Sequence, residues 1–307
     1  MTDHSDARVI LIAGPTASGK SAAALALADR IGGEIVNADA LQVYRDLQIL
    51  SSRPTVQEGS APHHLFGHID GAERYSVGRW AADAGAVLAE IAGRGCPAIV
   101  AGGTGLYFRA LTEGLSPAPE IPAAVRQEAE ARFAAIGPDA FRAEVIAADP
   151  AMGRLKPGDR QRHLRAWEVF QTTGAPLSQI QQQTGQAVAP AIAARIVLEP
   201  PRTDLYRAIE ARYDAMLAAG ALEEARALRA RGLGEALPVM KAVGVAELLR
   251  HLAGGLSLEA AIALAKQNSR RFAKRQMTWF RNQTGDWPRA SSPAAAADAL
   301  KSALRLP

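Results

Sequence analysis

The chain has 307 residues, of which 48% are hydrophobic and 21% are charged, and its formal net charge is +4. Such a composition is typical of a globular protein with one large domain, or with a core and an insertion. No apolar run approaches the roughly 20 residues that cross a bilayer, which excludes a membrane-spanning protein. Its one cysteine, Cys96, cannot form an intrachain disulfide. Residues 1–6 lack the apolar stretch of a secretion signal, so we expect a protein of the reducing cytoplasm without a membrane partner.

A glycine-rich loop lies near the start of the chain, between an apolar run at residues 9–13 and a predicted helix at residues 22–28. It fits the pattern G-x-x-x-x-G-K-[ST], in which loop N–H groups converge on phosphate oxygens at the positive end of a helix. Lys20 adds a mobile cation, and the hydroxyl of Ser21 can bind a phosphate-bound Mg²⁺. The motif predicts a diphosphate or triphosphate site made of Gly14, Pro15, Thr16, Ala17, Ser18, Gly19, Lys20 and Ser21.

Polar residues follow a second predicted strand, residues 33–39, which ends in Asp39. Ligands of parallel α/β sheets gather outside the carboxyl ends of the strands, so Asp39 should lie near the phosphate loop. Its position alone leaves two roles open, the N-cap of a following helix and a catalytic group. Farther along, His63 and His64 have no third metal ligand at useful spacing, so we expect structural or hydrogen-bonding roles for them.

The next predicted strand, residues 97–101, follows a helix predicted over residues 78–92 and runs into a glycine-rich stretch, residues 102–107. ATPases and GTPases with a phosphate loop usually carry an acid near this point, which holds the metal. The absence of that acid weakens a motor or switch function. Glycines at a strand end also allow another molecule's backbone to approach closely.

The residue pattern changes at Ser116, where Pro117, Pro119 and Pro122 mark the boundary of a new segment. From there to about residue 190 the sequence predicts a helical insertion with polar faces. We therefore predict an α/β fold with a parallel P-loop sheet flanked by helices. Its parts are the first part of the core at residues 1–115, the insertion at 116–190, and core completion with C-terminal helices at 191–307. The last part starts with a strand at 194–198 and continues in helices at 204–219, 222–231, 245–252 and from 258.

The last predicted helix is strongly basic on one side. On a wheel at about 100° per residue, its cations fall within an arc of roughly 140°. They are Arg270, Arg271, Lys274, Arg275 and Arg281. The opposite side, which we expect to pack inward, carries Phe272, Ala273, Met277, Trp279 and Phe280. A cationic stripe without interleaved acids favours contact with a polyanion, although a solubilising face has the same pattern.

Taken together, these segments resemble the bacterial tRNA dimethylallyltransferases, which prenylate N6 of the adenosine beside the anticodon. The resemblance runs in the family's order from residue 14 to residue 281. Beyond the phosphate loop it rests on Asn37-Ala38-Asp39, Gln42-Val43-Tyr44-Arg45, His63-His64-Leu65, Tyr75-Ser76-Val77, residues 102–107, Asp159-Arg160-Gln161-Arg162 with Arg165, Ala273-Lys274-Arg275-Gln276 and Thr278-Trp279-Phe280-Arg281.

The resemblance implies that the phosphate loop holds the diphosphate of dimethylallyl diphosphate with Mg²⁺, and that the allylic carbon is attacked, not phosphorus. It gives Thr16 and Arg212 roles at the donor phosphates and makes Asp39 the general base for the adenosine amine. It implies a monomer that binds the anticodon stem-loop of tRNA. The residues that it places at the tRNA are Asp39, Ala40, Leu41, Gln42, Thr104, Arg126, Gln161, Arg162, His163, Leu164 and Arg165.

The chain departs from the family's pattern at three places. Ala40 stands where a serine is common, which removes a hydroxyl contact. Val245 follows Gly244 in place of a tyrosine, which removes an expected tRNA contact. Residues 50–54, Leu-Ser-Ser-Arg-Pro, replace Gly-Thr-Ala-Lys-Pro. None of these departures falls in the phosphate loop or at Asp39.

Three other functions share parts of this pattern. An adenylate isopentenyltransferase would use the same donor, but a mononucleotide needs neither the helical insertion nor the basic helix. A small-molecule kinase with a phosphate loop would release ADP instead of diphosphate. A nucleic-acid-binding protein that takes nucleotide only as a ligand would show no turnover.

Overall fold

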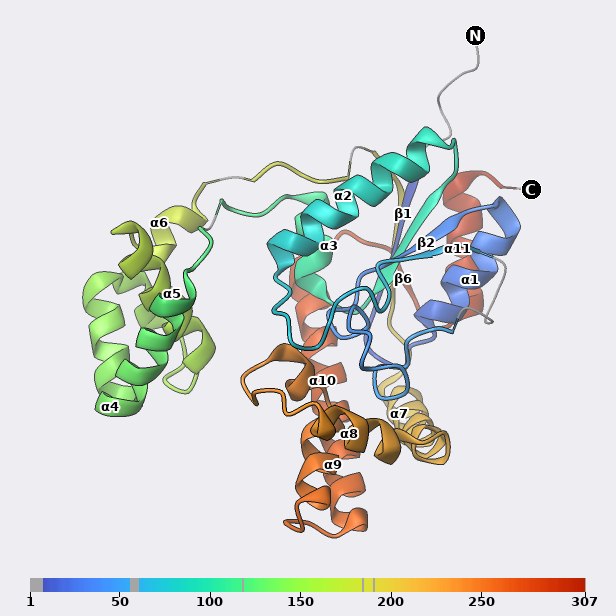
Figure 1. Cartoon of the computed structure of the whole chain (residues 1–307). Coiled ribbons are helices and arrows are strands. Elements are labelled where there is room, and N and C mark those ends of the chain that lie inside the picture. The colour runs from blue at the N-terminus through green and yellow to red at the C-terminus, as the bar shows by residue number, and fades with distance from the viewer. Residues whose placement is uncertain (1–7, 56–60, 118, 184, 190, 307) are drawn as a thin grey trace. The chain divides into compact units, whose positions relative to one another are not determined.

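The computed structural model describes residues 8–55, 61–117, 119–183, 185–189 and 191–306 (Figure 1). The chain forms two compact units, and the larger one joins Met1–Thr112 to Val188–Pro307. The smaller, helical unit is Glu113–Ala187. The sequence placed an insertion at residues 116–190, so both ends of the helical unit lie three residues earlier than expected. Among the described helices, none combines the length and hydropathy that a membrane crossing requires.

A parallel sheet forms the centre of the larger unit, with its six described strands in the order β3-β2-β4-β1-β5-β6. All residues of β1 are buried, as expected for a continuous apolar strand covered on both faces. The register pairs Asn37 with Ala101 and Ala13 with Gly102, so β2, β4 and β1 end at nearly the same level. The strands are β1 (Val9–Ala13), β2 (Glu34–Asn37), β3 (His63–His64), β4 (Ala98–Gly102), β5 (Ile192–Leu198) and β6 (Arg289–Ala290).

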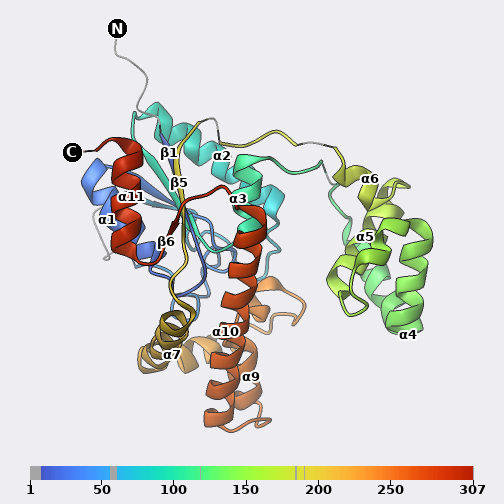
Figure 2. The same cartoon turned by 180° about the vertical axis from the view of Figure 1, so that it is seen from behind.

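Helices cover both faces of this sheet (Figures 1 and 2). On one face, α1 (Lys20–Ile31) and α11 (Pro293–Leu304) pack against each other and against β4 and β5. On the other face lie α2 (Val77–Gly93) and α3 (Gly105–Thr112), and α10 (Leu258–Gln283) packs on α3. Beyond the carboxyl edge of the sheet stand α7 (Arg202–Ala218), α8 (Ala221–Ala230), the short 3₁₀ helix η2 (Pro238–Lys241) and α9 (Val245–Leu252). The predicted fold class, a parallel P-loop sheet flanked by helices, is confirmed.

The end of β2 is held in place by Trp80 of α2. Its side chain is fully buried, and its ring stacks on that of Tyr107 in α3 with the ring centroids 4.1 Å apart. The indole N–H donates a hydrogen bond of 2.9 Å to the carbonyl oxygen of Asn37. A buried indole N–H needs such a partner, so this contact fixes α2 to the last residue of β2.

The helical unit has its own hydrophobic core, in which Phe141 and Val169 are fully buried. Its helices are α4 (Ala123–Ala148), the 3₁₀ helix η1 (Pro150–Arg154), α5 (Arg160–Thr173) and α6 (Leu177–Gln181). Gly137, with φ of 78°, and the following Pro138 kink α4. Asp159 caps α5, because its side chain accepts a hydrogen bond from the N–H of Arg162.

Gly102 offers a test of the packing at the carboxyl edge. A Cβ at this position would lie 2.0 Å from the carbonyl oxygen of Ala38. We expect Gly102→Ala to lower the free energy of unfolding by about 1–3 kcal/mol, because backbone must move to make room. Gly93→Ala in α2 is the matched control, since a Cβ there meets nothing within 4 Å and should leave stability unchanged or slightly raised. Urea unfolding followed by circular dichroism measures both, and equal stabilities would contradict the packing.

Candidate active site

The phosphate loop joins the end of β1 to the first turn of α1. Gly14 has a φ of 153° and Gly19 a φ of 88°. A Cβ at Gly14 would lie 2.6 Å from the carbonyl oxygen of Leu198, and one at Gly19 would lie 2.5 Å from Cγ of Pro293. Both glycines are therefore required by backbone conformation and by close neighbours. Since α1 begins at Lys20, the N–H groups of its first turn have no partner within the helix and are free to bind an anion.

The side chains of Lys20 and Ser18 form the polar part of the phosphate loop. Nζ of Lys20 donates a hydrogen bond of 2.7 Å to the carbonyl oxygen of Pro15. Burial lowers the pKa of Lys20 to about 8; the charge of Asp39 opposes this shift, and that of Arg212 adds to it. The hydroxyl of Ser18 is buried without a described hydrogen-bond partner, which is costly unless a ligand supplies one. Both features fit a loop that receives an anion.

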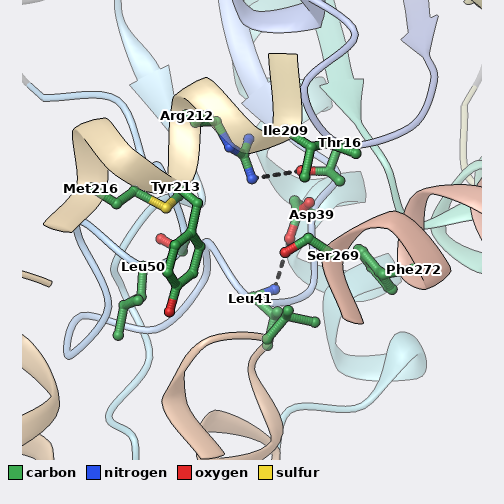
Figure 3. A pocket seen from close by; sticks show the side chains of 12 residues that line it. Thr16, Asp39, Leu41, Leu50, Ile209, Arg212, Tyr213, Met216, Ser269 and Phe272 are labelled. Atoms are coloured by element: carbon green, nitrogen blue, oxygen red, sulfur yellow. Dashed lines mark hydrogen bonds between the residues drawn. The ribbon is translucent and has the colours of Figure 1, made fainter. Parts of the chain in front are cut away.

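Thr16 and Arg212 form the second part of the phosphate side. A guanidinium nitrogen of Arg212, on α7, donates a hydrogen bond of 2.7 Å to the hydroxyl of Thr16 in the loop (Figure 3). Burial lowers the pKa of Arg212 and the charge of Asp39 opposes the shift, but a guanidinium stays protonated at neutral pH. The two residues that the resemblance places at the donor phosphates are thus in contact, although 196 positions separate them in the sequence.

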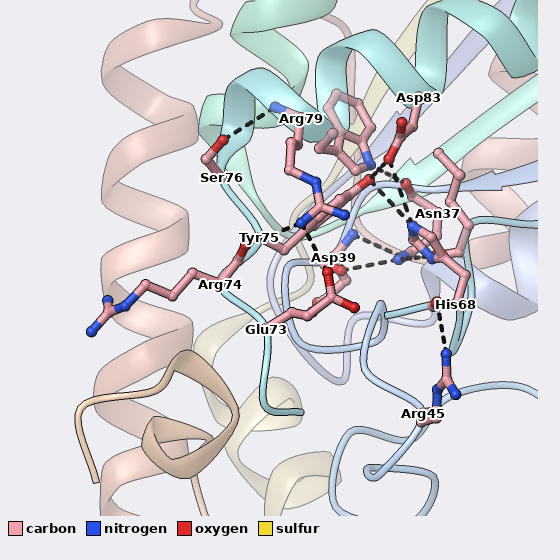
Figure 4. Close-up of polar contacts among 12 residues, drawn as sticks. Asn37, Asp39, Arg45, His68, Glu73, Arg74, Tyr75, Ser76, Arg79 and Asp83 are labelled. Carbon is pink, nitrogen blue, oxygen red and sulfur yellow. Dashed lines mark hydrogen bonds and ion pairs between the residues drawn. The ribbon is translucent and has the colours of Figure 1, made fainter. Parts of the chain in front are cut away.

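Asp39 is held in a tight turn after β2. Its Oδ1 accepts a hydrogen bond of 2.9 Å from the N–H of Leu41, and its own N–H donates to Oδ1 of Asn37 at 2.8 Å. The side-chain amide of Asn37 also donates to the carbonyl oxygens of Asp39 and Leu65, each at 3.0 Å (Figure 4). No described helix begins at Asp39, so the N-cap alternative is wrong, and the carboxylate caps a turn instead. Asn37 orients this turn, a role that sequence reasoning missed.

A polar network lies behind this turn (Figure 4). The hydroxyl of Tyr75 donates to Asp83 at 2.5 Å and lies 3.2 Å from Nε2 of His68. Burial raises the pKa of Tyr75, and the hydrogen bond to Asp83 raises it further, so the hydroxyl stays protonated. The next residue, Ser76, caps α2 by accepting a hydrogen bond from the N–H of Arg79. The segment Tyr75-Ser76-Val77 therefore supports the site without lining the pocket.

Each of the two adjacent histidines is hydrogen-bonded to another residue, as expected. Nε2 of His64 lies 2.6 Å from a carboxylate oxygen of Glu34, and Nδ1 of His63 lies 2.8 Å from the carbonyl oxygen of Ala61. Arg94 also donates to Glu34, and this hydrogen bond is the main reason that the pKa of Glu34 is lowered. Among the described residues no group of three His, Cys, Asp or Glu side chains could hold a metal ion.

Asp39, Thr16 and Arg212 line one pocket, whose empty volume is about 550 Å³ including the part open to solvent (Figure 3). The other lining residues are Leu41, Leu50, Ser51, Ile209, Tyr213, Met216, Val243, Ser269 and Phe272. Most of these are apolar, so a carboxylate and a cation face a hydrocarbon wall. The hydroxyl of Tyr213 is buried without a described partner. Sequence reasoning missed this wall, although the spacing of Ile209, Arg212, Tyr213 and Met216 marks one face of a helix.

The residues around Asp39 mostly contact the chain's own backbone. The hydroxyl of Thr104 accepts a hydrogen bond of 2.9 Å from the N–H of Ala40, and the side chain of Gln42 donates to the carbonyl oxygens of Ser51 and Ser52. Residues at two of the sequence departures also lie within the protein's own packing. Val245 is fully buried, so it packs where the family often has a tyrosine. Arg53 donates to the carbonyl oxygen of Leu47 at 3.3 Å.

The glycines after β4 do not leave room for another molecule. A Cβ at Gly103 would lie 2.3 Å from Nε2 of Gln276, and one at Gly105 would lie 2.2 Å from the ring of Trp279. The close approach expected at this strand end is therefore made by α10 of the same chain.

The remaining tRNA candidates lie in the helical unit and fall into two groups. Gln161 and Arg162 are exposed on the first turn of α5, where Arg162 pairs with Asp159 at 2.8 Å. Arg126 and Arg165 are half-buried, and burial lowers the pKa of Arg165, with a smaller contribution from the charge of Arg126. His163 and Leu164, only 2% and 6% exposed, point into the core. The expectation that these two side chains contact tRNA is corrected, because α5 buries one face of its first turns.

The surroundings of the basic helix, α10, also differ from those predicted by the helical wheel. Arg270 pairs with Glu210 of α7 at 2.7 Å, and Arg281 pairs with Glu199, which follows β5. The helix has no acidic residues among these cations, but Glu210 and Glu199 from other parts of the chain pair with two of them. Arg271, Lys274 and Arg275 are exposed. Of the residues expected to pack inward, Ala273, Met277 and Phe280 are buried, whereas Phe272 lines the pocket. A second cavity beside α10 is lined by Glu199, Arg202, Lys274, Arg281 and Arg289, among others.

The residues at the phosphate loop fit a Mg²⁺ ion that is bound together with a phosphate ligand. Ser21 is exposed on the first turn of α1 and can offer one hydroxyl oxygen. Mg²⁺ commonly keeps several waters and takes its other ligands from substrate phosphates. One hydroxyl beside an anion-binding loop fits this ion, with Ser21 as its protein ligand.

Comparisons with known proteins show the family to which the chain belongs. A family model described as "IPP transferase" matches residues 42–283, and one described as "Isopentenyl transferase" matches residues 7–66. The chain is 56% identical over 289 residues to the tRNA dimethylallyltransferase of Phenylobacterium zucineum, covering 93% of each chain. It is 50% identical over 302 residues to that of Maricaulis maris, covering 97% of this chain and 98% of the other. The solved tRNA isopentenylpyrophosphate transferase of Bacillus halodurans is 31% identical, with a TM-score of 0.68 and 97% of each chain covered. The chain belongs to the tRNA dimethylallyltransferase family.

Proposed function

We propose that this protein transfers the dimethylallyl group of dimethylallyl diphosphate to N6 of the adenosine next to the anticodon of tRNA, position 37, and releases diphosphate. The observation that carries the proposal is the pocket in which Asp39, Thr16 and Arg212 face an apolar wall. A kinase needs no hydrocarbon wall beside its phosphates, whereas a five-carbon prenyl group does. Membership of the family supports the same reaction.

The donor would lie with its diphosphate on the phosphate loop. As the bond between carbon and oxygen breaks, negative charge collects on the departing diphosphate. Lys20, Arg212 and the first N–H groups of α1 are positioned beforehand to stabilise that charge, as in other electrostatically preorganised sites. Mg²⁺ held by Ser21 and the phosphate oxygens would neutralise part of the same charge.

The acceptor is a weak nucleophile, because the lone pair of an exocyclic adenine amine is delocalised into the ring. In the proposed step, N6 forms a bond to the allylic carbon, the bond from that carbon to the diphosphate oxygen breaks, and Asp39 takes the N6 proton. The hydrogen bond from the N–H of Leu41 fixes Oδ1 of Asp39. This leaves Oδ2 for the proton. Such a base contributes about 10²–10⁴-fold to the rate.

The apolar side chains of the pocket would surround the dimethylallyl group. Leu50, Ile209 and Met216 would exclude water from the reacting carbon. Water would otherwise compete with the amine as the nucleophile. The unpartnered hydroxyl of Tyr213 is available for a hydrogen bond to the bound substrates.

The tRNA would be bound largely through its phosphates, with the target base extruded from the anticodon loop. Candidate contacts in the helical unit are Gln161, Arg162, Arg126 and Arg165, and those in the larger unit include the exposed cations of α10 and the cavity beside it. We further propose that the protein acts as a monomer in the cytoplasm, where tRNA and a reducing environment for Cys96 are found.

The reaction is tested with radiolabelled dimethylallyl diphosphate and either unmodified tRNA or AMP. We expect label in tRNA with release of one diphosphate per transfer, and none in AMP. Label in AMP alone would favour an adenylate isopentenyltransferase, and release of ADP from ATP a kinase. A tRNA whose adenosine 37 is replaced by guanosine is the matched control and should remain unlabelled.

The role of Asp39 is tested with Asp39→Asn. Asparagine keeps an oxygen that accepts the hydrogen bond from Leu41, so the turn is preserved, but it cannot take a proton. We expect kcat to fall by about 10²–10⁴-fold while the Kd for tRNA stays nearly unchanged. Single-turnover kinetics and filter binding provide the two quantities. Turnover close to that of the wild type would remove Asp39 as the base.

The lowered pKa of Lys20 predicts an alkaline limit to donor use. Lys20 binds the diphosphate best when protonated, and its pKa in the free protein is about 8. We expect kcat/KM for dimethylallyl diphosphate to fall about tenfold per pH unit above that pH, as Lys20 loses its proton. Lys20→Arg keeps its charge throughout, so its profile should lose this limb even if its activity is lower. An unchanged limb in Lys20→Arg would assign the ionisation to another group.

A further inference from the structure

Gln276 is a buried polar residue in the middle of the cationic segment of α10. Its side chain is 6% exposed, whereas Lys274 and Arg275 on the same turn are exposed. The amide oxygen accepts a hydrogen bond of 2.9 Å from the N–H of Thr16, and the amide nitrogen donates one of 2.8 Å to the carbonyl oxygen of Gly103. These partners are a donor and an acceptor, so they fix which way the amide points.

The two partners belong to the two halves of the active site. Thr16 lies in the phosphate loop, and its hydroxyl accepts the hydrogen bond from Arg212. Gly103 precedes Thr104, whose hydroxyl accepts from the N–H of Ala40 and whose own N–H donates to the carbonyl oxygen of Ala38 at 3.1 Å. Ala38 and Ala40 flank Asp39. The side chain of Gln276 is therefore hydrogen-bonded to the phosphate loop. Through Gly103 and Thr104 it is also connected to the turn that carries Asp39.

The loop after β4 packs closely against the amide of Gln276. A Cβ at Gly103 would lie 2.3 Å from Nε2 of Gln276, so the loop after β4 rests directly on the amide. Because both hydrogen-bonded groups belong to the backbone, loss of the amide would leave a part-buried N–H and a buried C=O unpaired.

We propose that Gln276 is a positioning residue that sets the distance between the diphosphate-holding loop and Asp39. The proposal rests on the function proposed above. It gives α10 two tasks, with exposed cations on its outer side and one buried amide that orders the catalytic groups on its inner side. Gln276 itself does not touch the reacting atoms.

The first test is Gln276→Met, which keeps the length of the side chain and removes both hydrogen bonds. We expect kcat/KM for dimethylallyl diphosphate to fall by about 10–100-fold, and the affinity for inorganic pyrophosphate to fall with it, because one part-buried and one buried hydrogen bond are lost. The Kd for tRNA should change by less than about threefold. Gln267→Met, an exposed glutamine of the same helix, is the matched control and should behave as the wild type.

The second test is Gln276→Glu, which separates hydrogen bonding from space filling. A protonated carboxyl group can accept from Thr16 and donate to Gly103, whereas a carboxylate would face the carbonyl oxygen of Gly103. Burial raises the pKa of such a carboxyl group, so the variant's activity relative to wild type should be near one at low pH and fall as pH rises. A ratio that does not vary with pH, or a Gln276→Met variant with unchanged pyrophosphate affinity and kcat/KM, would overturn the proposal.

Calorimetry with pyrophosphate measures the effect of Gln276 without turnover, so its outcome is independent of whether tRNA is the acceptor. Wild-type transfer to tRNA tests the reaction itself. If Gln276→Met does not fold, as judged by circular dichroism, the pH dependence of the activity ratio of the isosteric Gln276→Glu variant decides the question.

Discussion

The site depends on the common register of three parallel strands. Ala13 of β1 pairs with Gly102 of β4, and Ala101 pairs with Asn37 of β2, so three chain segments leave the sheet at one level. The phosphate loop, the turn of Asp39 and the loop that begins at Gly103 are these segments. The missing side chain of Gly102 lets β4 approach the backbone of Ala38 closely. A side chain there would separate the base from the phosphate side.

Burial of like charges prepares this region for an anion. Lys20 and Arg212 are both partly desolvated, which lowers the pKa of each, and Asp39 is the acid whose charge opposes both shifts. A diphosphate brings additional negative charge to groups that have already lost water. The electrostatic interaction is therefore strong, and little reorganisation is needed when charge develops on the departing group.

The two sides of helix α10 have different roles. Its outer side carries cations, but Arg270 and Arg281 are paired with Glu210 and Glu199, so the surface is less positive than the sequence alone indicates. An RNA phosphate at these positions would exchange one ion pair for another, and its gain is smaller than at the exposed Lys274. The inner side of the same helix supplies Gln276 to the phosphate loop.

The sequence by itself determined the sheet's buried strands, the phosphate loop and the position of Asp39 near that loop. These features depend on local patterns: apolar runs, fixed glycine spacing, and the rule that ligands gather at the carboxyl ends of strands. It also predicted β2, β4 and β5 to within one or two residues at each end. Only the tertiary structure decided what faces the pocket. Tyr213 and Met216 of α7 line it although more than a hundred residues of chain separate them from Asp39. Gln276 of α10 reaches the backbone of the phosphate loop in the same way. Periodicity shows which side of a helix is apolar, but not which segment covers it. For that reason the burial of His163 and the ion pair of Arg270 became visible only once the helices were packed.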